Sequence, residues 1–208
     1  SGREVFGFYP REMLANIRRR HDETSTALPR HYGVDGAPVV LQVDKNNDGT
    51  LDYRLGDEAY VYVGLRRGGS SYFALDISNP DAVPKWLWKI TPAAGGAFEE
   101  LGLTFSTPVV GKVNYSRVDA ADDAVGNAIY IVNARTGELI WKAVRGVTGV
   151  SSNTHYAHAG LVDSIPSTVA ALTTPAGITH RLYVGDSGGT VWRVDLPESA
   201  AGDENQRK

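Results

Sequence analysis

The chain has 208 residues, of which 42% are hydrophobic, and a formal net charge of −3. This length and composition suffice for a substantial core, and we expect residues 1–208 to form a single domain. The small net charge argues against nucleic acid or an anionic membrane as the main partner. Because the chain contains no cysteine, disulfides, thiolate metal sites and cysteine nucleophiles are excluded. No apolar run reaches the roughly 18 residues of a membrane helix, so we expect no direct membrane span.

The N-terminal part is predicted to contain a strand followed by a short helix. Residues 4–9 have strand character. Residues 11–20 are predicted to be helical, because Met13, Leu14 and Ile17 fall on one face at helical spacing. From about residue 33 onward the pattern is β throughout.

Residues 44–52 form an oxygen-rich run that reads DKNNDGTLD. This is the first half of an EF-hand-type calcium loop, in which positions one, three and five supply side-chain oxygens and position seven a backbone carbonyl. Leu55 stands at position twelve in place of the usual glutamate, so Asp52 at position nine is the natural closing ligand. The predicted ligands are therefore Asp44, Asn46, Asp48, the Thr50 carbonyl and Asp52. The alternative interpretation is a run that is merely rich in turn-forming residues.

The sequence on both sides of this run decides what kind of calcium loop it is. Residues 39–43 before it and residues 59–63 after it are both strand-like. We therefore expect a calcium-stapled connection between two strands. A helix–loop–helix sensor does not fit this pattern.

Three similar units follow one another along the rest of the chain. Each has an aromatic-bearing strand, a polar or glycine-containing turn, and a strand in which tryptophan precedes a basic residue. Trp88, Trp141 and Trp192 mark these second strands and recur about every 50 residues, the period of propeller blades. We expect the tryptophans to pack between neighbouring sheets. Stacking on a ligand is the alternative.

These units predict an all-β fold, a modified β-propeller with about three recognisable blades and one short N-terminal helix. Three units are fewer than the four to eight blades of a closed propeller. The middle unit also has no apolar run strong enough for a strand between Lys112 and Gly126. Either the propeller is incomplete, or residues are missing around Asn114 to Asp119.

Two short motifs suggest catalysis or zinc binding, and we interpret neither in that way. Residues 185–189 read GDSGG, the nucleophile signature of trypsin-like proteases, but they occupy the position of a turn between two strands of a repeat. His155 and His158 lack the helical pattern and the glutamate of a zinc motif, and are expected in a solvent-exposed loop. We predict no catalytic residues and no enzymatic activity.

A further set of residues resembles the C-terminal propeller of the PilY1 family. It consists of GLRRGGSSYFALD at 64–76, HYGVDGAP at 31–38, LYVGD at 182–186 and the acidic loop. The resemblance covers nearly the whole chain and implies a modified β-propeller that is a fragment of a larger PilY1-like propeller. It implies calcium as the cofactor, held by the same five ligands.

The resemblance also implies a biological role. PilY1-like proteins are type IV pilus biogenesis factors that tune pilus extension against retraction, twitching motility and surface adhesion. The implied partners are minor pilins of the pilus tip complex and host or abiotic surfaces. The implied location is the cell surface, at the pilus tip, extracellular and associated with the outer membrane.

The chain departs from the family pattern in two places. The middle unit lacks a strand and glycine-rich turn that the family usually carries before Gly126. Residues 173–180 read TTPAGITH where many members have a second aspartate-rich stretch, so one calcium site is expected. One alternative is a calcium-dependent quinoprotein dehydrogenase, against which stands the absence of a cysteine pair and of a convergent acidic pocket. The other is a purely structural propeller in which calcium only staples the fold.

Overall fold

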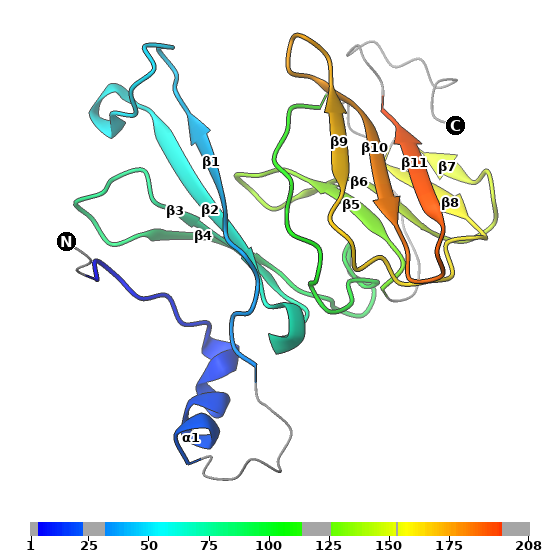
Figure 1. Ribbon diagram of the computed structural model, residues 1–208, viewed down its shortest axis with the longest axis horizontal. Coiled ribbons are helices and arrows are strands. Elements are labelled where there is room, and N and C mark those ends of the chain that lie inside the picture. Colours follow the sequence, from blue (N-terminus) through cyan, green and yellow to red (C-terminus); the bar gives the residue numbers. More distant parts are fainter. Residues whose placement is uncertain (1–3, 23–31, 114–125, 153, 197–208) are drawn as a thin grey trace.

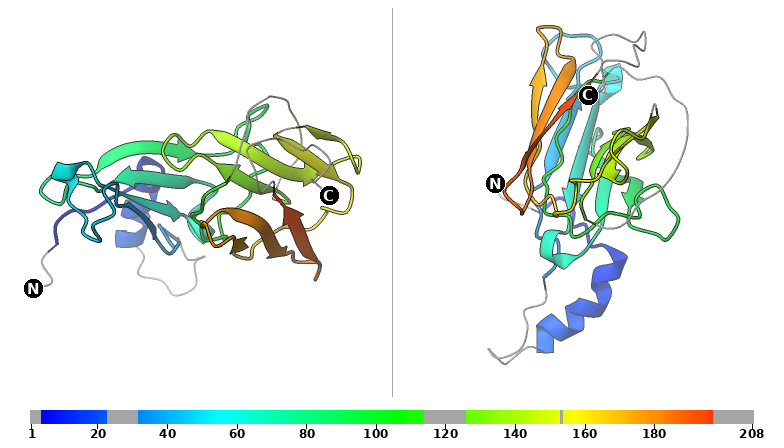
Figure 2. Two further views of the ribbon diagram at one scale, coloured as in Figure 1. Left: turned by 90° about the horizontal axis from the view of Figure 1, so that it is seen from above. Right: turned by 90° about the vertical axis from the view of Figure 1, so that its right-hand side faces the viewer.

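The computed structural model describes residues 4–22, 32–113, 126–152 and 154–196 (Figure 1). Within these ranges the chain forms three β-sheets and one α-helix. The second and third sheets lie next to each other, beside the first (Figures 1 and 2). The three described sheets do not close into a barrel, which confirms the predicted incomplete propeller with one short helix. The gap predicted around Asn114 to Asp119 lies outside the described residues.

The helix occupies the N-terminal part of the chain, as predicted. A 3₁₀ turn, Arg11–Met13, leads into α1 (Leu14–Asp22). Met13 is buried against Phe8, Val63, Leu65 and Phe73, whereas Leu14 and Ile17 are exposed, so the expected apolar face is only partly used. The predicted strand at residues 4–9 is wrong, because this segment forms no ladder with a described strand. Strand-forming side chains do not suffice without a backbone partner.

The first sheet is an antiparallel meander in the order β1-β2-β3-β4. Its strands are β1 (Val39–Val43), β2 (Glu58–Gly64), β3 (Tyr72–Asp76) and β4 (Lys85–Ile90). Val43 pairs with Glu58 at the end of the β1–β2 ladder. Residues 44–57 are therefore the connection between these two strands, as the sequence predicted.

The arginine- and glycine-rich run after β2 is fixed by very close backbone packing. A Cβ atom on Gly36 would lie 2.2 Å from the Gly64 carbonyl oxygen, and one on Gly68 would lie 1.9 Å from the Gly33 carbonyl oxygen. Only glycine permits such an approach. The buried hydroxyl of Thr104 accepts the backbone N–H of Leu65 at 2.8 Å. The run therefore locks the end of the first sheet to the segment that precedes β1.

The second and third sheets follow the repeat, with strands that the sequence did not predict. The second has the order β5-β6-β8-β7, and β8 runs parallel to β6. Its strands are β5 (Ile129–Val132), β6 (Leu139–Arg145), β7 (Ser151–Ser152) and β8 (His155–His158). The third is antiparallel, in the order β9-β10-β11. Its strands are β9 (Ala170–Thr173), β10 (Thr179–Gly185) and β11 (Val191–Asp195).

The expected exposed loop at the two histidines is wrong. Both lie on β8, where His155 is buried and His158 packs edge-on against Trp192, with ring centroids 5.1 Å apart. Parallel pairing with β6 places both residues in a sheet instead of a loop. A four-residue strand with this composition carries no local signal of its own.

The tryptophans of the repeat pack between neighbouring sheets, as predicted. The Trp88 indole N–H donates to the Ala134 carbonyl of the second sheet's first hairpin at 2.9 Å. Trp141 is buried in a cluster that includes Leu182 and Val184 of β10. Trp192 packs against the same cluster from β11. Each tryptophan thus joins its own sheet to another.

A buried ionic network also ties the segment after β4 to the second sheet. The Glu100 side chain is fully buried, and the Lys142 side chain is 4% exposed. Lys142 Nζ lies 3.2 Å from Glu100 Oε1, and the Tyr130 hydroxyl donates to Glu100 Oε2 at 2.7 Å. Burial, and then the hydrogen bond to Glu100, raise the pKa of Tyr130 well above its ordinary value. The network holds Tyr130 in its neutral, donating form.

Candidate calcium site

The predicted metal ligands all lie on the β1–β2 connection, at one end of the first sheet (Figure 1). The connection begins at Asp44, directly after β1. It continues through the acidic run to a 3₁₀ turn, Tyr53–Leu55, and returns to β2 at Glu58. The hairpin geometry therefore brings both ends of the loop together at the edge of a rigid sheet.

The first half of the loop is curled by hydrogen bonds from its own backbone. Asp44 Oδ1 accepts the Asn47 N–H at 2.7 Å, and its Oδ2 accepts the Gly49 N–H at 2.8 Å. Asn46 Oδ1 accepts the Asp48 N–H at 3.1 Å. Asn47 and Gly49 have φ values of 57° and 80°, in the left-handed region that Asn and Gly tolerate best. The turn that the motif requires is thus present.

The same half of the loop links three of the five predicted ligands directly. The Asn46 side-chain amide donates to Asp48 Oδ2 at 2.9 Å. Asp48 Oδ1 in turn accepts the Thr50 N–H at 2.8 Å. Asn46, Asp48 and Thr50 therefore follow one another along one hydrogen-bonded curl that begins at Asp44.

Asp52, the predicted closing ligand, has a second role in this structure. Its Oδ1 accepts the Arg54 N–H at 2.9 Å and so caps the 3₁₀ turn. Gly56, with φ at 94°, ends that turn. Asp52 is thus oriented by the backbone that follows it, rather than by the other predicted ligands.

Asp57 is a functional candidate that the sequence analysis missed. Its side chain is buried, with the residue 3% exposed. Its Oδ1 accepts the Lys45 N–H at 2.9 Å, and its Oδ2 accepts the Asp52 N–H at 2.9 Å. These two backbone donors, and then the charge of Lys45, hold the pKa of Asp57 below its ordinary value. The signal available in the sequence was an additional acidic residue directly before a strand.

The donor set fits a hard cation in its chemistry. Three carboxylates, one amide oxygen and one backbone carbonyl within nine residues are the ligands that Ca²⁺ prefers. In the part of the chain that the structure describes, no three acidic or histidine side chains are placed so that they could hold a metal. In the loop, the Asp44 and Asp48 carboxylates accept backbone N–H groups of the same curl. Metal binding would require the predicted ligand oxygens to come closer together.

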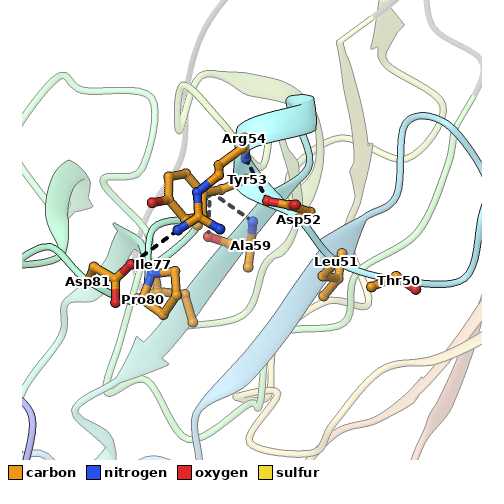
Figure 3. A pocket seen from close by; sticks show the side chains of 10 residues that line it. Thr50, Leu51, Asp52, Tyr53, Arg54, Ala59, Ile77, Pro80 and Asp81 are labelled. Carbon is orange, nitrogen blue, oxygen red and sulfur yellow. Dashed lines mark hydrogen bonds and ion pairs between the residues drawn. The ribbon is translucent and has the colours of Figure 1, made fainter.

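A pocket of about 440 Å³ adjoins the loop (Figure 3). Two predicted ligands, Thr50 and Asp52, contribute to its lining. The Arg54 guanidinium lies 5.0 Å from the centre of the Tyr53 ring and 3.8 Å from Asp81. The lining residues are Thr50, Leu51, Asp52, Tyr53, Arg54, Ala59, Ile77, Ser78, Pro80 and Asp81. The second half of the loop thus forms one wall of a surface hollow.

The protease-like motif is a turn, as predicted. Residues 186–190 connect β10 to β11, and the Asp186 N–H donates to the Thr190 carbonyl at 2.9 Å. The Asp186 carboxylate accepts the Thr190 N–H and the Trp192 indole N–H, both at 2.8 Å. The Ser187 hydroxyl lies 3.2 Å from the Ser164 hydroxyl. The Asp186 carboxylate, next to Ser187, therefore stabilises the turn instead of orienting a catalytic base.

No helix among the described residues is both long enough and apolar enough to cross a bilayer.

Comparisons with known proteins identify the family. The family model described as "PilY1 beta-propeller domain" matches residues 13–208. The chain is 28% identical over 206 residues to the type IV pilus biogenesis factor PilY1 homolog of Xylella fastidiosa, covering 96% of the chain and 15% of that protein. It is 27% identical over 205 residues to PilY1 of Pseudomonas aeruginosa strain UCBPP-PA14, covering 98% of the chain and 16% of that protein.

The fold is shared with a solved relative. The crystal structure of the Pseudomonas aeruginosa PilY1 C-terminal domain matches with a TM-score of 0.59 and 22% identity. The match covers 99% of this chain and 37% of that one. The chain spans only 15% and 16% of the length of the two curated relatives. Because the family model covers nearly all of its residues, the chain belongs to the PilY1 β-propeller domain family.

Proposed function

We propose that this chain is a calcium-binding, non-enzymatic propeller module of a type IV pilus biogenesis factor. The observation that carries the proposal is the oxygen-rich loop between β1 and β2, whose ends are joined by the buried Asp57 carboxylate. Membership of the PilY1 family supplies the pilus context. In this proposal residues 1–208 form one domain within a larger propeller.

Five residues would hold the metal: Asp44, Asn46, Asp48, Thr50 through its carbonyl, and Asp52. When bound, Ca²⁺ supplies the positive charge that lets three neighbouring carboxylates share one site. Asp44 and Asp48 would exchange backbone N–H groups for the metal. Asp57 keeps the first and last parts of the loop together in either state, which lowers the entropy cost of closing it.

The metal would act on a surface that other proteins bind. Calcium sites of extracellular modules bind at about 10⁻⁴ to 10⁻³ M, so occupancy would follow extracellular calcium. The bound state would favour one arrangement of the loop and the adjoining pocket. Through minor pilins at the pilus tip, and through host or abiotic surfaces, this would bias pilus extension against retraction, twitching motility and adhesion. The module would lie at the cell surface, outside the cell and associated with the outer membrane.

The enzyme alternative gains no support from the comparisons. The curated relatives reported above carry the names of pilus biogenesis factors. The protease-like motif has its carboxylate committed to a turn. A calcium-dependent quinoprotein dehydrogenase is therefore not proposed.

Calcium titration of the purified chain tests the binding claim. With a dissociation constant of about 10⁻⁴ M, 1 mM calcium would stabilise the folded state by about 1.4 kcal/mol. For a domain of this size that is a rise in Tm of about 3–6 °C. Asp52→Ala should remove most of the rise, whereas Asp81→Ala, which alters an exposed acid beside the loop, should retain it. An unchanged Tm in the unsubstituted chain would refute calcium binding.

The pilus role requires the full-length protein in a piliated bacterium. Asp52→Ala should alter the number of surface pili and the width of the twitching zone, with the protein present at its usual level. A normal twitching zone in a strain whose protein has lost calcium binding would show that the metal only staples the fold.

A further inference from the structure

The dipeptide Asp57–Glu58 stands between the metal loop and the second sheet. Asp57 is the last residue before β2, and Glu58 is its first residue, paired with Val43 in the ladder. Neither belongs to the predicted ligand set. Their side chains nevertheless contact both the loop and a neighbouring hairpin, which gives the dipeptide a specific place in the fold.

The Asp57 carboxylate closes the loop from inside. Its two oxygens accept the N–H groups of Lys45 and Asp52, each at 2.9 Å. The Lys45 N–H directly follows the first predicted ligand, Asp44, and the Asp52 N–H belongs to the last predicted ligand. A displacement of Asp44 or Asp52 therefore reaches Asp57 through a single peptide unit.

The Glu58 carboxylate carries the connection out of the loop. Its Oε1 accepts the Lys45 ammonium at 2.7 Å, so Lys45 is held by its backbone on Asp57 and by its side chain on Glu58. Its Oε2 accepts the guanidinium of Arg135. The Glu58 side chain is 22% exposed, whereas those of Lys45 and Arg135 are 47% and 55% exposed, so solvent screens both ion pairs in part. One carboxylate thus bridges the metal loop and a residue 77 positions away in the sequence.

Arg135 belongs to the hairpin where the first and second sheets meet. The preceding residue, Ala134, accepts the Trp88 indole N–H at 2.9 Å. Two residues further on, a Cβ atom on Gly137 would lie 2.8 Å from the Trp88 ring. Trp88 also stacks on Tyr62 of β2, with ring centroids 5.7 Å apart. A movement of Arg135 therefore acts on a tightly packed contact with little free space.

We propose that Asp57 and Glu58 are positioning residues that couple calcium occupancy of the loop to the contact between Trp88 and the 133–138 hairpin. The proposal rests on the calcium binding proposed above. Calcium binding at Asp44 and Asp52 shifts the backbone N–H groups of Lys45 and Asp52, which both donate to Asp57. It also shifts the Lys45 ammonium, which pairs with Glu58, and Glu58 pairs in turn with Arg135. The partner whose position responds is the second sheet of the same chain.

The coupling is reciprocal, because two linked equilibria change each other by the same factor. In the proposed coupling, calcium occupancy and the Glu58–Arg135 ion pair strengthen each other, so Arg135→Ala should weaken calcium binding by about two- to fivefold, the range expected for a partly exposed ion pair. Electrostatic attraction alone would change the affinity in the opposite direction, since removing a positive charge near the loop favours the binding of a cation. Arg54→Ala is the matched control: it removes an arginine two residues after Asp52, whose guanidinium lies 3.8 Å from Asp81. It should leave the affinity unchanged or slightly higher.

The test combines calorimetric titration of calcium with ¹⁵N spectra of the tryptophan indole groups. The Trp88 indole resonance should move along the same titration curve as the heat of binding. The Trp192 indole, which donates to Asp186 in the third sheet, is the internal control and should move far less. In Arg135→Ala the Trp88 movement should be largely lost while calcium still binds.

Three results are decisive. Calcium binding with a coupled Trp88 shift that depends on Arg135 supports the proposal. Calcium binding with a stationary Trp88, or with a shift that Arg135→Ala leaves intact, overturns the coupling and leaves the proposed calcium site standing. No heat of binding in the unsubstituted chain overturns both, because there is then no metal-bound state to transmit.

Discussion

The buried ion pair between Glu100 and Lys142 provides a stability prediction whose magnitude follows from the structure. The Glu100 side chain is fully buried and that of Lys142 is 4% exposed, so water can solvate neither charge. Lys142 Nζ lies 3.2 and 3.5 Å from the two Glu100 oxygens, and Tyr130 donates to one of them. Glu100→Gln leaves the ammonium in this environment without a counter-charge. The expected loss is about 3–5 kcal/mol, as for other buried pairs broken on one side.

Urea unfolding followed by circular dichroism measures this loss, with the slope of the transition checked against the parent chain. In thermal unfolding the same loss corresponds to a fall in Tm of about 6–20 °C for a domain of this size. The double variant Glu100→Gln with Lys142→Met should recover much of the stability, because it removes both charges together. As a surface control, Asp81→Asn, which breaks an exposed pair with Arg54, should cost less than about 0.5 kcal/mol. A loss below about 1 kcal/mol for Glu100→Gln would show that the pair is not buried in solution.

Three further predictions concern the sheet contact and the pH dependence of stability. Gly137→Ala should lower the free energy of unfolding by roughly 2–5 kcal/mol, because it adds a clash with Trp88 to the strain of a φ of 73°. Gly149→Ala, with a φ of 89° and no atom within 4 Å of the new Cβ, should show the cost of the strain alone. Equal losses of stability for the two variants in urea unfolding would contradict the packing of Gly137 against Trp88. The lowered pKa of Asp57 stabilises the fold above the unfolded pKa of about 3.9, and this contribution is lost as the pH falls through the lower folded value. Asp57→Asn should therefore reduce the dependence of stability on pH in the acid range. An unchanged dependence would argue against the hydrogen bonds of Asp57 to Lys45 and Asp52. Burial raises the pKa of Tyr72 to about 12, so its contribution to the stability of the fold is complete below about pH 10 and is lost as the pH rises through 12. Stability measured from pH 9 to 12 should therefore fall less steeply in Tyr72→Phe than in the parent chain. Parallel curves would mean that the hydroxyl is solvated.

The elements predicted correctly are those whose signal is local. Residues 39–43 were predicted as a strand, and β1 has those bounds. The hairpin of residues 181–193 was recognised from an aromatic strand, a glycine turn and a tryptophan strand, all adjacent in sequence. The β8 strand was missed because its partner β6 is parallel and reached through an intervening strand, and no alternation of apolar residues marks it.

The same distinction applies to the candidate site. Asp44, Asn46 and Asp48 could be singled out from spacing alone, since the loop curls around its own backbone. Asp57 could not, because its role depends on the hairpin returning to place a carboxylate beneath Lys45 and Asp52. Residues 4–9 show the converse error, in which β-forming side chains predicted a strand that lacks a partner among the described residues.

The most direct test of the central claim is an anomalous difference map from crystals grown in millimolar calcium. We expect a peak inside the β1–β2 connection, with oxygens of Asp44, Asn46, Asp48, Thr50 and Asp52 about 2.3–2.6 Å away. Asp57 should keep both of its backbone hydrogen bonds. A map without a peak there, with the Asp44 and Asp48 carboxylates still accepting the loop's own N–H groups, would show that the loop does not bind calcium.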